Sequence, residues 1–161
     1  MRPLETRDRA RIREIVVAAG NFNAAEIATA LELVDEALAK GEASGYLFLL
    51  LEDAADPPAL QGYACYGPTP LTDGVYDLYW IVVDPAAQGR GMGRRLLALA
   101  EEDVRRRGGR KLLIETSSLE SYAGTSRFYE RSGYALVARI RDFYKLGDDK
   151  LVFSKDFLRE P

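Results

Sequence analysis

The chain has 161 residues, a length typical of one domain, which we place over residues 1–161. Its 22 basic and 25 acidic residues leave a formal net charge of −3, so no general positive field is available to hold nucleic acid. It has one cysteine, Cys65, and no histidine, which excludes an intrachain disulfide, Ser-His-Asp and Cys-His nucleophiles, and histidine-ligated metal sites.

The first third of the chain predicts two helices. After a short extended start at Arg2–Leu4, we predict Thr6 as the N-cap of a helix that ends at Gly20. A second helix fits Ala24–Lys40, where apolar residues recur on one face. The connection between the helices, Asn21-Phe22-Asn23, is irregular, and we expect it to border a pocket.

Strand patterns dominate the middle of the chain. Three consecutive strands are predicted, at Gly45–Glu52, Leu60–Tyr66 and Val75–Asp84. The first is a nearly continuous apolar run, which indicates a strand buried on both faces. The third is dense in aromatic and β-branched residues, which favour strands.

The last third of the chain alternates helices and strands. The predicted elements are a helix at Gly93–Arg107, a strand at Lys111–Thr116, a helix at Ser121–Ser132, and strands at Tyr134–Ile140 and Lys150–Phe157 joined by a loop at Arg141–Asp149. The whole order, β-α-α-β-β-β-α-β-α-β-β, predicts an α+β fold. The expected architecture is one central mixed α/β sheet of about six or seven strands, with about four helices in all distributed over its two faces. Residues 75–116 form one right-handed parallel crossover.

A glycine-rich turn connects the third of these middle strands to the next helix. Gly89, Gly91 and Gly93 let the backbone approach a ligand and turn its N–H groups toward it. They lead into a helix N-terminus, where unpaired N–H groups and the helix dipole favour a phosphate. The turn is not a P-loop, because Arg94 stands where a lysine is needed, and its spacing does not fit a dinucleotide fingerprint.

At this turn the chain resembles the Gcn5-related N-acetyltransferase (GNAT) superfamily. The segment Gln88-Gly-Arg-Gly-Met-Gly93 matches its acetyl-CoA motif, [Gln/Arg]-x-x-Gly-x-[Gly/Ala], and Val83-Asp-Pro85 fits the residues upstream. The segment Phe128-Tyr-Glu-Arg-Ser-Gly-Tyr134 fits a second family motif. The resemblance implies a GNAT-like fold, acetyl-CoA as co-substrate, no metal, and transfer of an acetyl group to a primary amine.

The resemblance also implies which residues hold the cofactor. The main chain of Ile81, Val82 and Val83 would bind the pantetheine arm as an extra strand, and their side chains would be core. The phosphates would be bound at the turn, by Gln88, Gly89, Arg90, Gly91, Met92, Gly93 and Arg94. Many relatives carry a CoA-contacting asparagine where this chain has Tyr122, whose hydroxyl either replaces that contact or only lines the groove.

Charge supports a phosphate site at the turn. Eight basic residues stand against three acidic ones between Gln88 and Lys111. Arg90, Arg94 and Arg95 are close enough to the turn to meet phosphates. We interpret Arg105–Arg107 instead as a solvated last helical turn that complements the helix dipole.

For proton transfer, the resemblance places a general-acid tyrosine at Tyr129. A phenol with a pKa of ~10 can donate to a nascent thiolate whose acid has a pKa of ~8.5. Packing of the ring on the sheet, with a contact from Phe128 or Tyr129 to Tyr134, is the alternative role and is compatible with the first.

Two carboxylates are candidates for the general base, Asp77 and Glu115, each of which could instead be a solvated or ion-paired strand-end residue. An α-amine needs such a base less than a lysine does, because its lower pKa leaves more of it neutral. Deprotonation through water is therefore a third option.

Substrate selection is expected from aromatic side chains near these groups. The candidates are Phe22 in the Asn21–Asn23 connection, Tyr79 and Trp80, and Phe143 and Tyr144 in the Arg141–Asp149 segment. Aromatic rings with nearby carboxylates suit a small cationic amine, although an ordinary hairpin loop also fits the last segment. Cys65 is interpreted as a small buried hydrophobe.

These features favour direct acetyl transfer in a ternary complex, because no histidine or activated cysteine supports an acyl-enzyme. The alternatives are a non-catalytic acyl-CoA-binding sensor or interaction module, and an enzyme with a longer acyl donor. The expected partner is a small-molecule or peptide amine, without nucleic acid or membrane, and a homodimer is a family-level expectation. We expect a cytoplasmic protein, because the start of the chain lacks an apolar signal segment and no apolar run reaches ~18 residues.

Overall fold

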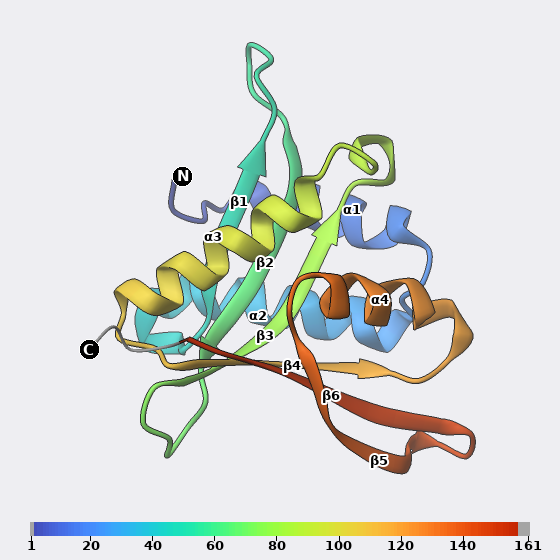
Figure 1. Cartoon of the computed structure of the whole chain (residues 1–161). Helices are drawn as coiled ribbons and strands as arrows, with labels where there is room; N and C mark the ends of the chain where they lie inside the picture. The colour runs from blue at the N-terminus through green and yellow to red at the C-terminus, as the bar shows by residue number, and fades with distance from the viewer. Residues whose placement is uncertain (1, 158–161) are drawn as a thin grey trace.

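A computed structural model describes residues 2–157, so the domain expected over 1–161 extends beyond the described residues at both ends. Figure 1 shows one sheet with helices on both faces. Four helices are present in this part of the chain: α1 (Asp8–Ala19), α2 (Ala24–Lys40), α3 (Met92–Arg106) and α4 (Ala123–Arg131). Three short 3-10 turns accompany them: η1 (Gly41–Ser44), η2 (Pro85–Ala87) and η3 (Glu120–Tyr122).

Six strands form the sheet within residues 2–157. They are β1 (Leu47–Glu52), β2 (Leu60–Pro68), β3 (Val75–Val83), β4 (Lys111–Ser117), β5 (Ala135–Lys145) and β6 (Asp148–Asp156). The spatial order is β1-β2-β3-β4-β6-β5. All neighbours are antiparallel except β3 and β4. The predicted α+β class is therefore confirmed.

The amino-terminal end differs from the expectation. Within the described residues no strand forms at Arg2–Leu4, and Thr6 does not cap α1, so both predictions are wrong. The guanidinium of Arg2 instead pairs with Asp8 at 2.7 Å and with Glu52 at 2.8 Å. The Asp8 carboxylate also accepts a hydrogen bond from the backbone N–H of Glu5 at 2.8 Å. A buried carboxylate with several donors outcompetes a threonine hydroxyl for the start of this helix.

The second helix has the predicted bounds because its start is capped twice. The Asn23 side chain accepts from the backbone N–H of Glu26 at 2.9 Å, and the Glu26 carboxylate accepts from the N–H of Asn23 at 2.7 Å. This capping box fixes where the irregular Asn21–Asn23 connection enters α2.

Two apolar layers hold the helices to the sheet (Figure 1). Leu96, Leu97 and Ala100 of α3 are buried on one face together with residues of β1 to β4 and β6, and Tyr129 of α4 belongs to the same cluster. On the other face α1 and α2 pack over β2, where Cys65 is fully buried. Burial raises the pKa of the Cys65 thiol, which supports its interpretation as an inert core residue.

The two parallel strands separate halfway along. Residues Val75–Leu78 of β3 pair with Lys111–Ile114 of β4, and the pairing stops there. Beyond this point β3 continues beside β2 while β4 stays beside β6, and Figure 1 shows the two strands diverging. Within the described residues, the edge of β3 from Tyr79 to Val83 that would face β4 therefore has no neighbouring strand.

The last two strands are longer than predicted. The segment expected as a loop at Arg141–Asp149 is mostly strand, and its turn is limited to Leu146–Gly147. Asp142 and Gly147 have positive φ values of 50° and 81°, and Asp149 accepts from the N–H of Asp142 at 2.9 Å. Because β5 is an exposed edge strand along its whole length, it lacks the alternation of apolar residues by which strands are recognised. No helix in residues 2–157 is long and apolar enough to span a membrane.

Candidate active site

Local hydrogen bonds stabilise the conformation of the glycine-rich turn. Asp84 accepts a hydrogen bond from the N–H of Ala86 at 2.8 Å, and the Gln88 side chain donates to the carbonyl of Val83 at 3.3 Å. Gly89 and Gly91 have φ values of 77° and 74°, in the left-handed region, and Gly91 is the N-cap of α3. Glycine adopts this conformation without the steric cost that other residues incur.

This geometry leaves a run of main-chain donors free. Among residues 2–157, none of the six consecutive N–H groups from Gly89 to Arg94 finds an acceptor. The side chains of Arg90, Arg94 and Arg95 likewise make no ion pair with the described part of the chain. Free N–H groups and arginines around a helix N-terminus constitute an anion site.

The arginines at the other end of α3 are engaged within the protein. Arg105 lies 3.5 Å from Glu101, Arg106 lies 2.8 Å from Asp103, and Arg107 pairs with both Asp103 and Glu42. These arginines are exposed, as expected for a solvated turn, and they are also ion-paired, so the unpaired charge of this helix is concentrated at its N-terminal end.

A groove of about 620 Å³ runs along the turn. We call it the glycine groove. It is lined by Ile81, Val83, Gln88, Gly89, Gly91, Met92, Gly93, Arg94, Gly124, Thr125, Phe128 and Tyr129. The Val82 side chain is buried in the opposite core layer, as predicted, and Arg90 is exposed on the turn outside the groove wall.

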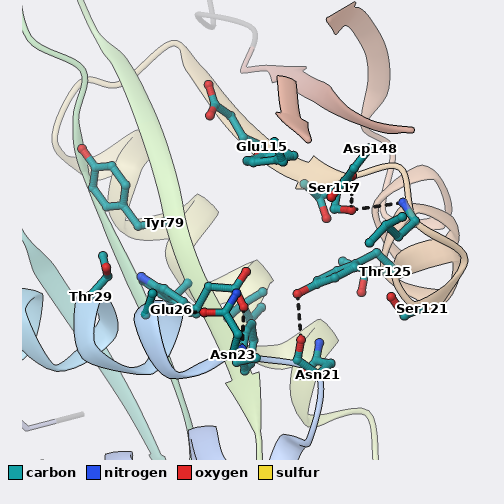
Figure 2. Close-up of a pocket in the computed structure, with 18 of the residues that line it drawn as sticks. Asn21, Asn23, Glu26, Thr29, Tyr79, Glu115, Ser117, Ser121, Thr125 and Asp148 are labelled. Carbon is teal, nitrogen blue, oxygen red and sulfur yellow. Dashed lines mark hydrogen bonds between the residues drawn. The ribbon is translucent and has the colours of Figure 1, made fainter. Parts of the chain in front are cut away.

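A second cavity, of about 670 Å³, lies on the other side of the β3–β4 separation. We call it the acidic cavity, because three of its lining residues are carboxylates: Glu26, Glu115 and Asp148. Figure 2 shows Asn21 and Asn23 of the α1–α2 connection on one side of it, and Ser117 and Asp148 across from them. Its walls thus come from both ends of the chain.

The groove and the cavity meet. Ile81 of β3 and Thr125 and Tyr129 of α4 line both. This shared wall lies where β3 has left β4, so the two spaces adjoin at the point where the pairing of these strands ends. A ligand in the groove and another in the cavity would approach each other beside Tyr129.

Tyr129 is firmly held at this wall. Its ring is 4 % exposed and packs against Phe128, Tyr134 and Phe153 at centroid distances of 5.4, 6.0 and 5.8 Å, which confirms the predicted contact with Tyr134. Its hydroxyl makes no hydrogen bond to the described residues. Burial raises the pKa of the phenol, so Tyr129 stays protonated and its O–H is available to a ligand.

A partly buried ion pair anchors the end of α4 that carries Tyr129. The Lys155 ammonium donates to both oxygens of Glu101 at 2.9 Å and to the carbonyl of Ser132, the C-cap of α4, also at 2.9 Å. The Tyr134 hydroxyl donates to the same Glu101 carboxylate at 3.1 Å. These bonds tie α4 to α3 and β6.

The two predicted bases occupy different positions. Glu115 lines the acidic cavity, and its carboxylate lies 2.6 Å from the Lys150 ammonium. Asp77 is half-buried outside the cavity wall and accepts a hydrogen bond from the Thr69 hydroxyl at 2.6 Å. Burial raises the pKa of Asp77, the Thr69 hydrogen bond opposes this, and the charge of Glu115 adds to it.

Four of the five predicted aromatic side chains line the acidic cavity: Phe22, Tyr79, Trp80 and Tyr144. Phe22 and Trp80 pack edge to face at a centroid distance of 5.1 Å. Burial, and then the charge of Asp77, raises the pKa of Tyr79 to about 12. The exception, Phe143, is half exposed and lies under the Lys150 ammonium, 3.8 Å from its ring centroid.

Tyr122 lines the acidic cavity and is absent from the wall of the glycine groove. Its hydroxyl donates to the carbonyl of Asn21 at 3.0 Å, which links it to the α1–α2 connection. A contact with the cofactor through Tyr122 stays a prediction, and the observed bond agrees better with the alternative that it only lines the site.

Sequence reasoning did not single out several residues of the site, among them Thr125, Glu26, Ser117 and Asp148. Asp148 lies within the Arg141–Asp149 segment expected to select substrate, but nothing in the sequence separates it from its acidic neighbours. Glu26 could be recognised only as a helix cap. Their common location depends on the fold.

Comparisons with known proteins agree with this geometry. The family model described as the acetyltransferase (GNAT) family matches residues 10–134. A crystal structure from Desulfovibrio desulfuricans, of a protein assigned to the GNAT acetyltransferases, is 46 % identical, with 97 % of this chain and 96 % of that chain covered and a TM-score of 0.91. A Salmonella typhimurium structure assigned as an acetyltransferase, with its cofactor acetyl-CoA, is 21 % identical over 99 % of this chain and 94 % of that chain, with a TM-score of 0.73.

One curated relative matches only locally. The mycothiol acetyltransferase of Cellulomonas flavigena is 41 % identical over 64 residues, which are 40 % of this chain and 18 % of that protein. The chain therefore matches less than a fifth of the length of this relative.

Proposed function

The chain belongs to the acetyltransferase (GNAT) family, and from this premise we propose that it transfers an acetyl group from acetyl-CoA to a primary amine. In this proposal the amine attacks directly in a ternary complex, with Tyr129 as general acid. The observation that carries the proposal is the wall shared by the glycine groove and the acidic cavity at Tyr129. The glycine groove is rich in N–H donors and suits phosphates, and the acidic cavity suits a cation.

The residues of the glycine groove fit acetyl-CoA. The six free N–H groups of Gly89 to Arg94 and the guanidinium of Arg94 supply donors and positive charge for a diphosphate. The open edge of β3, from Tyr79 to Val83, offers main-chain groups to an extended arm that carries amides. When bound, acetyl-CoA would supply the acetyl thioester.

Tyr129 would protonate the leaving thiolate. The ring is fixed by three aromatic neighbours, and its hydroxyl is free to donate at the wall that both ligands reach. Because burial raises the pKa of the phenol, the proton is present throughout the physiological range. A positioned acid of this kind typically accelerates a reaction by about 10²–10⁴-fold.

Glu115 is the better-placed base of the two carboxylates. It lines the cavity in which the amine would wait, and Lys150 holds it in position at 2.6 Å. Asp77 lies outside the cavity wall and accepts a hydrogen bond from the Thr69 hydroxyl. This position supports an electrostatic role from outside the cavity. The proposed acceptor is a cationic small-molecule or peptide amine, because the cavity combines carboxylates with aromatic rings.

The test is release of the CoA thiol from acetyl-CoA in the presence of a panel of amines, with calorimetry of CoA binding alongside. We expect heat with CoA and thiol release that depends on the amine. Binding without release across the panel would favour the acyl-CoA sensor instead. Absence of heat with CoA and acetyl-CoA, together with no shift in the melting temperature, would overturn the assignment.

A further inference from the structure

Asp148 is a buried acid at the start of β6. It is 5 % exposed and lines the acidic cavity, where Figure 2 shows it beside Ser117. The Ser117 hydroxyl donates to one carboxylate oxygen, Oδ1, at 2.5 Å. The other oxygen, Oδ2, has no hydrogen-bond donor among residues 2–157, and no cation of that part of the chain lies within ion-pair distance.

The other buried acids of the described residues are neutralised by the protein itself. Asp8 pairs with Arg2, Glu101 with Lys155, and Asp149 with Arg139. None of these three lines the acidic cavity. A carboxylate removed from water is costly unless a cation balances it. Asp148 is thus the one buried acid among residues 2–157 without an ion-pair partner, and it lines a space open to ligands.

The cavity around Asp148 carries negative charge. Burial raises the pKa of Tyr122, and the charges of Glu26 and Asp148 add to that rise. Burial also raises the pKa of Tyr144, with Glu115, Asp148 and Glu26 among the further causes. Glu115 has Lys150 as a partner, and Lys145 also lines the cavity without pairing with Asp148. The carboxylates of this one cavity therefore contribute to the raised pKa values of two separate tyrosines.

Asp148 is not on the wall where the reaction would occur. The residues shared by cavity and groove are Ile81, Thr125 and Tyr129, so an amine attacking the thioester must lie beside them. Asp148 is absent from this shared set, and the cavity volume of about 670 Å³ leaves room for a second cationic group beside the amine.

We infer that the acceptor carries two cationic groups, one amine that is acetylated at the shared wall and a second cationic group that Asp148 binds. This inference rests on the proposed acetyl transfer and identifies its substrate class. Asp148 would then be a binding residue that selects the acceptor and takes no part in proton transfer.

The test compares straight-chain acceptors of matched length, with three to eight methylene groups. Each length is assayed as the diamine, the amino alcohol and the monoamine, by thiol release from acetyl-CoA. We expect one or more diamines to have the lowest KM. We expect Asp148→Asn to raise the KM for those diamines by about tenfold or more, because a charged hydrogen bond is lost, and to change the KM for monoamines by less than about twofold.

Two variants control for structure. Asp149→Asn removes the neighbouring buried acid, which pairs with Arg139 and does not line the cavity, so it should leave the diamine preference intact. Asp148→Glu keeps the charge and should keep a preference for diamines, with a different optimal length. The wild-type comparison needs no variant, so it decides the inference even if Asp148→Asn fails to fold.

Failure of the inference is distinguishable from failure of the proposed function. Equal KM values for wild type with diamines and monoamines, or an equal effect of Asp148→Asn on both, would overturn the role of Asp148 while acetyl transfer stands. If no amine supports release, acetyl transfer fails, and calorimetry of the same diamines with CoA-loaded protein decides the inference. Diamine heat that disappears in Asp148→Asn supports it, and heat that is unchanged or absent in wild type overturns it.

Discussion

The glycine groove and the acidic cavity recognise ligands by different means. The groove presents main-chain N–H groups from one continuous turn, with Gly89 and Gly91 in left-handed conformations. The cavity presents side chains from the α1–α2 connection, α2, β3, β4, α4 and the β5–β6 hairpin. A site built from one turn suits a constant part of a ligand, whereas a site assembled from many elements can vary residue by residue. Under the proposed function, the shared cofactor binds in the groove and the acceptor is selected in the cavity.

The largest expected effect is at the wall that the two spaces share. Tyr129→Phe removes one hydroxyl and keeps the ring packing, so the turnover rate should fall by about 10²–10⁴-fold while CoA affinity is unchanged. The measurement is kcat by thiol release, with calorimetry of CoA binding.

Tyr66→Phe is the matched control for the Tyr129 variant. It also removes a buried tyrosine hydroxyl, one that is bonded to Asp103 and lines neither space, and should leave kcat near wild type. Full turnover in Tyr129→Phe would show that the thiolate leaves without this acid.

On the acceptor side, Glu115→Gln should lower kcat/KM for a lysine-type amine by about 10–100-fold, because the carboxylate facing the amine can no longer take its proton. The effect should be smaller for an α-amine, whose lower pKa leaves more of it neutral. Asp77→Asn changes a residue outside the cavity wall and should reduce kcat/KM for the lysine-type amine far less. If both variants keep the pH–rate profile of wild type, deprotonation through water is the correct description.

On the donor side, Gly91→Ala forces a side chain into a left-handed conformation that costs about 1–2 kcal/mol. A Cβ at Gly91 meets nothing within 4 Å, so the strain is conformational, and relief by rotation would disturb the N–H groups beside it. We expect CoA affinity to fall by about tenfold. Gly108→Ala imposes the same strain at the far end of α3, where φ is 79°. It should lower the melting temperature similarly and leave CoA affinity alone; equal losses of affinity would contradict a role for the turn.

The smallest effect concerns charge at the two ends of α3. Arg94→Ala removes an unpaired guanidinium that lines the groove, and CoA affinity should fall by a few-fold, with a weaker dependence on salt. Arg105→Ala removes a guanidinium that pairs with Glu101 and lies 4.2 Å from the centroid of the Phe157 ring. Its effect on CoA affinity should be negligible. Titration of both variants at low and high ionic strength distinguishes the two ends.

Prediction from the sequence succeeded where the signal is local. The bounds of α2 follow from its periodicity and its cap at Asn23, and the glycine turn follows from the spacing of three residues. It failed at Arg2–Leu4 and Thr6, where the ion pair of Asp8 with Arg2 outcompetes the local preference. It also failed at Arg141–Asp149, because an exposed edge strand carries no apolar alternation.

The sequence by itself determined the order of elements from α1 onward, the turn that presents its N–H groups and the presence of Tyr129 in a family motif. Only the tertiary structure decided that β3 and β4 part after Leu78, that the groove and the cavity meet at Tyr129, and that Asp148 lines a ligand space without an ion-pair partner among residues 2–157. The physical reason is the range of the interactions involved. Backbone conformation and helix caps depend on residues a few positions apart, whereas the balance of a buried charge depends on every element packed around it.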